Sequence, residues 1–307
     1  MNSQMLSISG YTQKYLLSQL TKSLSRGDYQ SASLWSVEMH ISGWIVKWWI
    51  GIVSYCANYI HISNPKISKF LWKMSMDYPV LRGMPGNPNS NEIRQVIALV
   101  VGVCVFSPKD NPHNIPKPLN VAESDRSELF HSIDKIQVIK EVQHVSMEKD
   151  SIIMKKLLSN LAKNIRESNY CGCFRILSIC LFLEKHKSYK NTITCATRNW
   201  KGLQQKHWNS WIFLLWDLLF YLGKNKNIED IIGSWRALYI MNCDKSKFNS
   251  LLSYVVNSIS LLTNDIKTNL PCVHNENMIN KGCQKIDYIY GTVLKNYAAN
   301  RAVYNFN

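Results

Sequence analysis

Charged residues are scarce in this 307-residue chain, and acidic residues are the scarcer kind. Only 19% of the residues are charged, and 21 Asp and Glu stand against 36 Lys and Arg, a formal net charge of +15. With 46% hydrophobic residues the chain is not intrinsically disordered. Nine prolines and 13 glycines exclude a collagen-like or low-complexity protein. The excess of positive charge favours an acidic partner such as nucleic acid, an anionic membrane surface or an acidic protein.

Long hydrophobic runs and secretory features are also missing. The apolar runs at 96–106 and 211–222 are shorter than the roughly 20 residues that cross a bilayer, and the run at 43–60 is interrupted by Lys47. We therefore expect buried core helices and no membrane span. The first residues lack the charged start and apolar stretch of a signal peptide, and nine cysteines fit no small disulfide scaffold. We expect free thiols and a cytoplasmic or nuclear location.

Sequence motifs of common enzyme classes are absent. The chain has no GxxxxGK[ST] phosphate loop, no HExxH, GxSxG or GxGxxG motif, and no kinase motif set. Cys171, Cys173, Cys180 and His186 could meet a zinc ion, but zinc sites usually begin with two to four residues between paired cysteines. We predict that these thiols are core residues. We predict no catalytic, cofactor-binding or metal-binding residues, and no enzyme.

Apolar residues recur at helical spacing along most of the chain, which predicts an all-α protein. Residues 15–39 form a helical hairpin in this interpretation, broken at 26–28, where Asp28 can cap the second helix. Further helices are predicted at 44–60, 66–76, 92–106, 151–187, 200–222, 228–241 and 248–262. The valines of 92–106 leave a strand as an alternative, and the last forty residues have weak patterning.

Two segments of the chain are alike, which predicts an internal duplication. Without a gap, 14–39 and 155–180 share seven identical residues, and both keep an Asx residue before a tyrosine. The alternative is that any two leucine-rich amphipathic helices look similar. We predict two related helical subdomains, 1–106 and 151–307, with duplicated parts at 14–106 and 151–241. Residues 107–150 would join them as a proline-rich linker and an acidic junction.

The first copy carries a further pattern. Lys22-Ser23-Leu24 is followed by Asp28, Ala32 and Trp35 at fixed spacing. Within the later segment 57–65, the residues that belong to the pattern are Ile60, Ile62, Asn64 and Pro65. These residues resemble the helical collar segment of clamp-loader-like AAA+ ATPases of the replication-associated recombination protein A (WRN-interacting) family, without its Ser-Glu-Asp core. The resemblance covers 44 residues. It implies a collar-like subdomain that holds subunits together in a replication assembly, and without a phosphate loop it implies no ATP hydrolysis.

Tryptophans and lysines supply the candidate binding residues. We predict a protein interface at Trp35, Trp44 and Trp48. Residues 151–206 hold eleven Lys and Arg against two acidic residues, with aromatic residues among them, as in a groove that binds a nucleic-acid strand. The predicted nucleic-acid-binding residues are Lys155, Lys156, Lys163, Arg166, Lys185, Lys187, Lys190, Arg198, Lys201 and Lys206. The alternative is a set of solvated lysines on helix surfaces.

These observations lead to one function and one alternative. We predict a non-catalytic helical adaptor of a DNA replication or nucleoprotein assembly, which binds nucleic acid through a basic face and has protein partners or forms a homo-oligomer. The alternative is a structural or scaffold protein, such as a virus-encoded virion component in an infected cell, that acts by protein–protein contacts. Only nucleic-acid binding should weaken steeply with salt.

Overall fold

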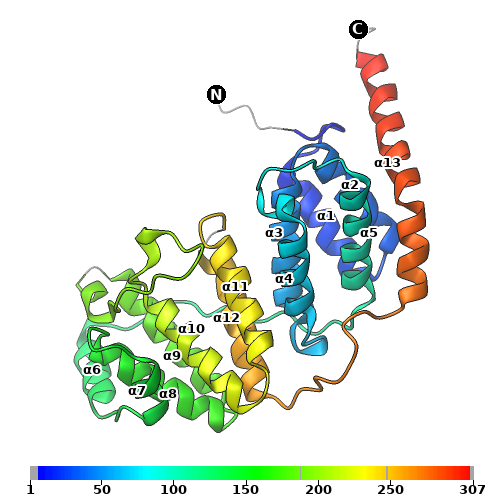
Figure 1. The fold of residues 1–307 in the computed structure, drawn as a ribbon. Helices are drawn as coiled ribbons and strands as arrows, with labels where there is room; N and C mark the ends of the chain where they lie inside the picture. Colours follow the sequence, from blue (N-terminus) through cyan, green and yellow to red (C-terminus); the bar gives the residue numbers. More distant parts are fainter. Residues whose placement is uncertain (1–5, 187, 247, 305–307) are drawn as a thin grey trace. The chain divides into compact units, whose positions relative to one another are not determined.

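The computed structural model describes residues 6–186, 188–246 and 248–304, and these residues form helices and no strand (Figure 1). The predicted all-α fold is confirmed. The α-helices are α1 (Gln13–Arg26), α2 (Tyr29–Ile41), α3 (Ile45–Tyr55), α4 (Ile67–Asp77), α5 (Asn91–Phe106), α6 (Arg126–Asp134), α7 (Lys140–Val145), α8 (Ile152–Arg166), α9 (Tyr170–Lys185), α10 (Trp211–Asn225), α11 (Glu229–Asn242), α12 (Phe248–Thr263) and α13 (Glu276–Tyr304).

The chain divides into two compact units. Unit 1 comprises the chain up to Asn111 together with the chain from Asn269 onward, and unit 2 comprises Pro112–Thr268. This division differs from the predicted segments 1–106, 107–150 and 151–307 in two places. The acidic segment folds as α6 and α7, which pack on α8 and α10 within unit 2. The C-terminal helix α13 belongs to unit 1, where it packs on α5 and α2.

Two helical hairpins, α1–α2 and α8–α9, turn with the same local chemistry. Gly27 ends α1 in the left-handed region at φ 73°, and the Asp28 carboxylate then accepts a hydrogen bond from the Ser31 amide. In the second hairpin Ser168 has φ 53°, and Asn169 caps α9 in the same way. The predicted hairpin at 15–39 is therefore confirmed. The internal duplication stays a prediction, because unrelated hairpins with such sequences would turn alike.

Helix α5 forms the centre of unit 1. Ser90 caps its first turn by accepting from the Ile93 amide, which settles the helix-or-strand alternative in favour of a helix. Its valines are buried because α1, α2 and α13 pack around it. A helix that is apolar on nearly every side is stable only when it is surrounded in this way. Among the helices of the described residues, none is both long enough and apolar enough to cross a membrane.

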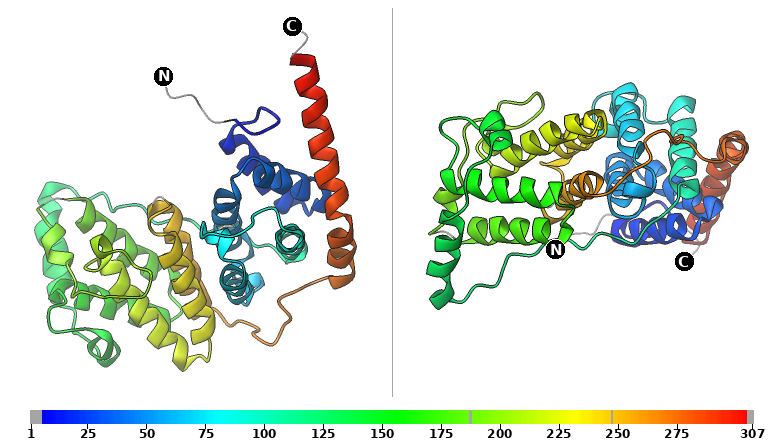
Figure 2. Two further views of the ribbon diagram at one scale, coloured as in Figure 1. Left: turned by 45° about the horizontal axis from the view of Figure 1, so that its top comes forward. Right: turned by 90° about the horizontal axis from the view of Figure 1, so that it is seen from below.

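Helix α13 runs beside the other helices of unit 1 (Figure 2), and two glycines allow its close approach to α2 and α5. A Cβ atom added at Gly282 of α13 would lie 2.3 Å from the Tyr29 ring of α2, and one added at Gly102 of α5 would lie 2.8 Å from Ile279 of α13. The Tyr29 hydroxyl donates to the carbonyl oxygen of Ala98 at 3.2 Å. Helix α13 thus packs so closely against α2 and α5 that a methyl group at Gly282 or Gly102 would overlap a neighbouring side chain.

A second contact of α13 passes through the buried His40. Its Nε2 lies 2.6 Å from the Pro88 carbonyl oxygen, and its Nδ1 lies 2.5 Å from the Tyr290 hydroxyl. The carbonyl can only accept, so the neutral ring donates from Nε2 and accepts the Tyr290 proton at Nδ1. Burial lowers the pKa of His40, and the nearby charge of Arg94 adds to this shift.

One predicted helix starts later than expected. Residues 200–210 were predicted to begin the helix at 200–222, but they contain only a 3₁₀ turn at Gln205–His207, and α10 begins at Trp211. The Trp208 indole N–H donates to the Leu203 carbonyl oxygen at 3.0 Å, which closes this part of the chain on itself. We call residues 186–210 the basic loop.

Substitution of Gly282 tests the docking of α13. We expect Gly282→Ala to destabilise unit 1 by about 1–3 kcal/mol, because the methyl group would overlap Tyr29. Gly291→Ala is the matched control on the same helix: its Cβ meets nothing within 4 Å, so it should be neutral or stabilise by up to about 1 kcal/mol. Urea unfolding and hydrogen exchange of α13 measure both. Equal effects at the two positions would show that α13 does not pack as described.

The stability of unit 1 should depend on pH through His40. Because the folded-state pKa lies below the ordinary value of 6.5, the unfolded chain takes up the proton first. Stability is therefore fully present above pH 6.5 and falls as the pH drops below it. Urea unfolding between about pH 7.5 and 5.5 should show this loss in the wild type and a smaller one in His40→Asn. An equal loss in both proteins would rule out His40 as its source.

Candidate nucleic-acid interface

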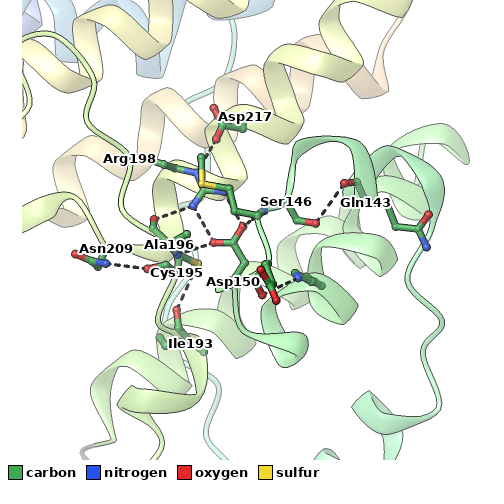
Figure 3. A network of polar contacts seen from close by, with 12 residues as sticks. Gln143, Ser146, Asp150, Ile193, Cys195, Ala196, Arg198, Asn209 and Asp217 are labelled. Carbon is green, nitrogen blue, oxygen red and sulfur yellow. Dashed lines mark hydrogen bonds and ion pairs between the residues drawn. The ribbon is translucent and has the colours of Figure 1, made fainter.

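Arg198, one of the predicted nucleic-acid-binding residues, is buried in unit 2 (Figure 3). Its two Nη atoms each lie 2.9 Å from an oxygen of Asp150, and its Nε donates to Asp217 at 2.6 Å. The Arg198 and Asp150 side chains are both fully buried. The prediction for Arg198 is therefore wrong: its guanidinium group is held by two carboxylates and cannot reach a phosphate.

The pKa values of the two carboxylates around Arg198 are shifted in opposite directions. Burial alone would raise the pKa of Asp150, but hydrogen bonds from Arg198 and from the Met147 and Ala196 amides lower it below its ordinary value. Burial raises the pKa of Asp217 against the opposing effect of Arg198. Asp150 is thus the firmly charged partner, and the bidentate pair is the stronger of the two contacts.

This network fixes the basic loop from within. Asp150 lies just before α8, Asp217 lies in α10, and Arg198 comes from the middle of the loop between them in space. Asp150 also accepts from the Ala196 amide at 2.7 Å, and the Asn209 side chain donates to the Cys195 carbonyl oxygen at 3.0 Å. A long loop held by these contacts presents its outer side chains from a fixed backbone.

The predicted basic residues on α8 and α9 lie at the two opposite ends of this hairpin and do not form one continuous face. Helices α8 and α9 are antiparallel neighbours, because only 167–169 join them. Lys163 and Arg166 lie at the turn between them, whereas Lys155 and Lys185 lie at the opposite end, where the basic loop begins. At 1.5 Å per residue, the two ends of α8 are about 20 Å apart.

Several of these cations are already paired with acidic residues. The acidic segment supplies Asp134, 3.0 Å from Lys156, and Glu141, 3.2 Å from Arg166. The remaining pairs are Lys163 with Glu167 at 3.9 Å and Lys206 with Asp244 at 2.6 Å. Lys185 and Lys201 are exposed and form no ion pair with a described residue. Lys187 lies outside the described residues, as does the side chain of Lys190.

The predicted tryptophan interface is largely a core. Trp48 is fully buried and Trp44 is 8% exposed, so neither can contact a partner from the surface of unit 1. This part of the prediction is wrong, because both rings fill the interior around α3. Trp35 is half-buried, and its ring packs edge-on against Tyr11 and Tyr15 at centroid distances of 5.8 and 6.2 Å.

The cysteines are free thiols, as expected. Cys173 and Cys180 are buried, which agrees with their prediction as core residues, whereas Cys171 is exposed and is not a core residue. Burial raises the pKa of Cys173 to about 12.

Comparison of the chain with protein-family models, with curated protein sequences and with solved structures gave no match. The function must therefore be argued from the geometry of the site. The sequence interpretation missed Asp150 and the buried role of Arg198. A signal was present at Asp217, because an acidic residue in the middle of the apolar run 211–222 needs a polar or cationic partner if it is buried.

Removal of the buried cation should destabilise unit 2 strongly. We expect Arg198→Met to cost about 3–5 kcal/mol, because Asp150 would be left buried and unpaired. Arg175→Met, at an exposed position of α9, is the matched control and should change stability by less than about 0.5 kcal/mol. Thermal and urea unfolding measure the difference. A small effect at Arg198 would contradict the network.

Proposed function

We propose that the protein is a non-catalytic helical adaptor of a DNA replication or nucleoprotein assembly and binds nucleic acid through exposed cations of unit 2. The observation that carries this proposal is a pair of exposed lysines that form no ion pair with a described acidic residue, Lys185 at the end of α9 and Lys201 in the basic loop. Lys155, near the start of α8, lies at the same end of the α8–α9 hairpin as Lys185; it is half-buried, and its Nζ donates to the Glu148 carbonyl oxygen at 3.4 Å. We call Lys155, Lys185 and Lys201 the loop-end cations.

The proposed contact is with the phosphate backbone rather than with bases. Lysines on helix ends and on an anchored loop can neutralise phosphates and release counterions, which gives affinity without sequence specificity. The aromatic residues nearby are already engaged. Trp200 has Arg236 stacked 4.7 Å from its ring centroid and Phe213 packed edge-on at 5.3 Å, and the Tyr189 ring lies 5.0 Å from that of Phe130. Stacking on unpaired bases, which needs open aromatic faces, is thus less favoured than backbone binding.

The adaptor role rests on the separation of the chain into two units. Unit 1 contains residues 22–65, whose resemblance to a replication collar segment favours contacts with other protein subunits. In this proposal unit 1 binds protein and unit 2 binds nucleic acid. The alternative, a virus-encoded scaffold, needs protein contacts only and would not depend on the loop-end cations.

Charge reversal of the loop-end cations tests the proposal. We expect Lys155→Glu, Lys185→Glu and Lys201→Glu together to weaken binding to a labelled DNA duplex at least tenfold. We also expect them to reduce the slope of log affinity against log salt by about 3. Fluorescence anisotropy at several salt concentrations between about 50 and 200 mM measures both quantities.

The control reverses the same amount of charge elsewhere in unit 2, at the exposed Lys117, Lys224 and Lys226. It should weaken binding less than threefold, because only the long-range field changes. Equal losses in the two triple variants would point to a general charge effect and contradict a site at the loop end. A wild-type protein that does not bind DNA but self-associates in sedimentation would support the scaffold instead.

A further inference from the structure

Three metal-ligating side chains meet where the basic loop reaches the end of α11. His207 Nε2 lies 2.9 Å from Asp244 Oδ1, and Cys243 Sγ lies 3.9 Å from Asp244 Oδ2. One ligand atom from each residue can be chosen so that all three lie within 4.8 Å of one another. In the part of the chain that the structure describes, no other group of three such side chains comes this close. None of the three residues belongs to the loop-end cations.

We propose that His207, Cys243 and Asp244 form a binding site for a divalent transition-metal ion of the Zn²⁺ class. A mixed set of imidazole nitrogen, thiolate sulfur and carboxylate oxygen is typical of tetrahedral zinc. With bonds of about 2.0–2.3 Å, ligand atoms around such an ion lie about 3.3–3.8 Å apart. The observed separations fall on both sides of that range, so side-chain shifts of about 1 Å would complete the site.

The fourth coordination position would face a cavity. His207 and Cys243 line a cavity of about 250 Å³ together with Glu184, Ser210 and Tyr239. Three protein ligands beside an open cavity leave room for a water molecule or a carboxylate at the fourth position. The His207 and Asp244 side chains are 30% and 19% exposed, so an ion could enter from solvent.

Lys206 would compete with a metal ion for the Asp244 carboxylate. Its Nζ lies 2.6 Å from Asp244 Oδ1, the same oxygen that faces His207. A metal ion would displace this ammonium group from the carboxylate, and the Cys243 thiol would release its proton to solvent. Bound metal would therefore strengthen the link between the basic loop and the segment that follows α11, beside the stacking of Arg236 of α11 on Trp200.

Titration of the full-length protein with Co²⁺ tests the site, because tetrahedral Co²⁺ bound by a thiolate absorbs visibly and shows a sulfur-to-cobalt charge-transfer band. We expect one equivalent to bind with both features and Zn²⁺ to displace it. Cys243→Ser should abolish the charge-transfer band, and His207→Gln should weaken binding at least tenfold. Lys206→Met should tighten binding about two- to fivefold, because it removes the competing cation.

The control is Cys171→Ser, which removes an exposed thiol of the same unit and should leave the titration unchanged. Circular dichroism checks that each variant is folded. Absence of the charge-transfer band in the wild type, or its loss in Cys171→Ser rather than Cys243→Ser, would overturn the proposal. Unchanged or weaker binding in Lys206→Met would also overturn it, because Asp244 would then not be a ligand. DNA binding plays no part in these measurements, so this proposal and the proposed function can fail separately.

Discussion

The buried guanidinium group of Arg198 is the interaction on which the arrangement of unit 2 depends. It joins the start of α8, the middle of α10 and the basic loop, whose described residues form two 3₁₀ turns and no α-helix. A charge at this depth is tolerated only because Asp150 and Asp217 face it with well-directed hydrogen bonds. Alternative loop conformations are disfavoured, because they would leave at least one of these three charges buried and unpaired.

The local features of the fold could be predicted from the sequence because their causes are local. The leucine stripe of α1, the break at Gly27 and the cap at Asp28 lie within a few residues of one another, so periodicity and capping chemistry identify them. The Asn169 cap of the α8–α9 hairpin is equally local, although the helix predicted at 151–187 lacks the break that the structure has at 167–169. Helix α13 was missed because polar residues dilute its apolar positions, although Ile279, Ile286 and Val293 recur at a spacing of seven.

The candidate site could be predicted only in part, because charge counts ignore pairing across distance. The segment 151–206 does contain the exposed Lys185 and Lys201. Its excess of charge is lowered in space by Asp134 and Glu141, which lie in a segment that the sequence assigns to a junction. Arg198 and Asp150 are 48 residues apart, and no local pattern distinguishes a buried arginine from an exposed one. Composition thus identified the cationic region but not which of its residues are exposed and which are paired or buried.

The basic loop carries residues of both candidate binding sites. Its inner side is held by Arg198, and its outer side carries Lys201 and His207. A loop that is anchored from within can present cations at fixed positions without a regular helix beneath them, which reduces the entropy lost when a ligand binds. Near α10 the loop also contacts Asp244, which follows α11, through Lys206 and His207, and this carboxylate is partly exposed. Since the Arg198 amide donates to the Trp208 carbonyl oxygen at 2.9 Å, a ligand at Asp244 would support the same loop backbone that the arginine network holds from the other side.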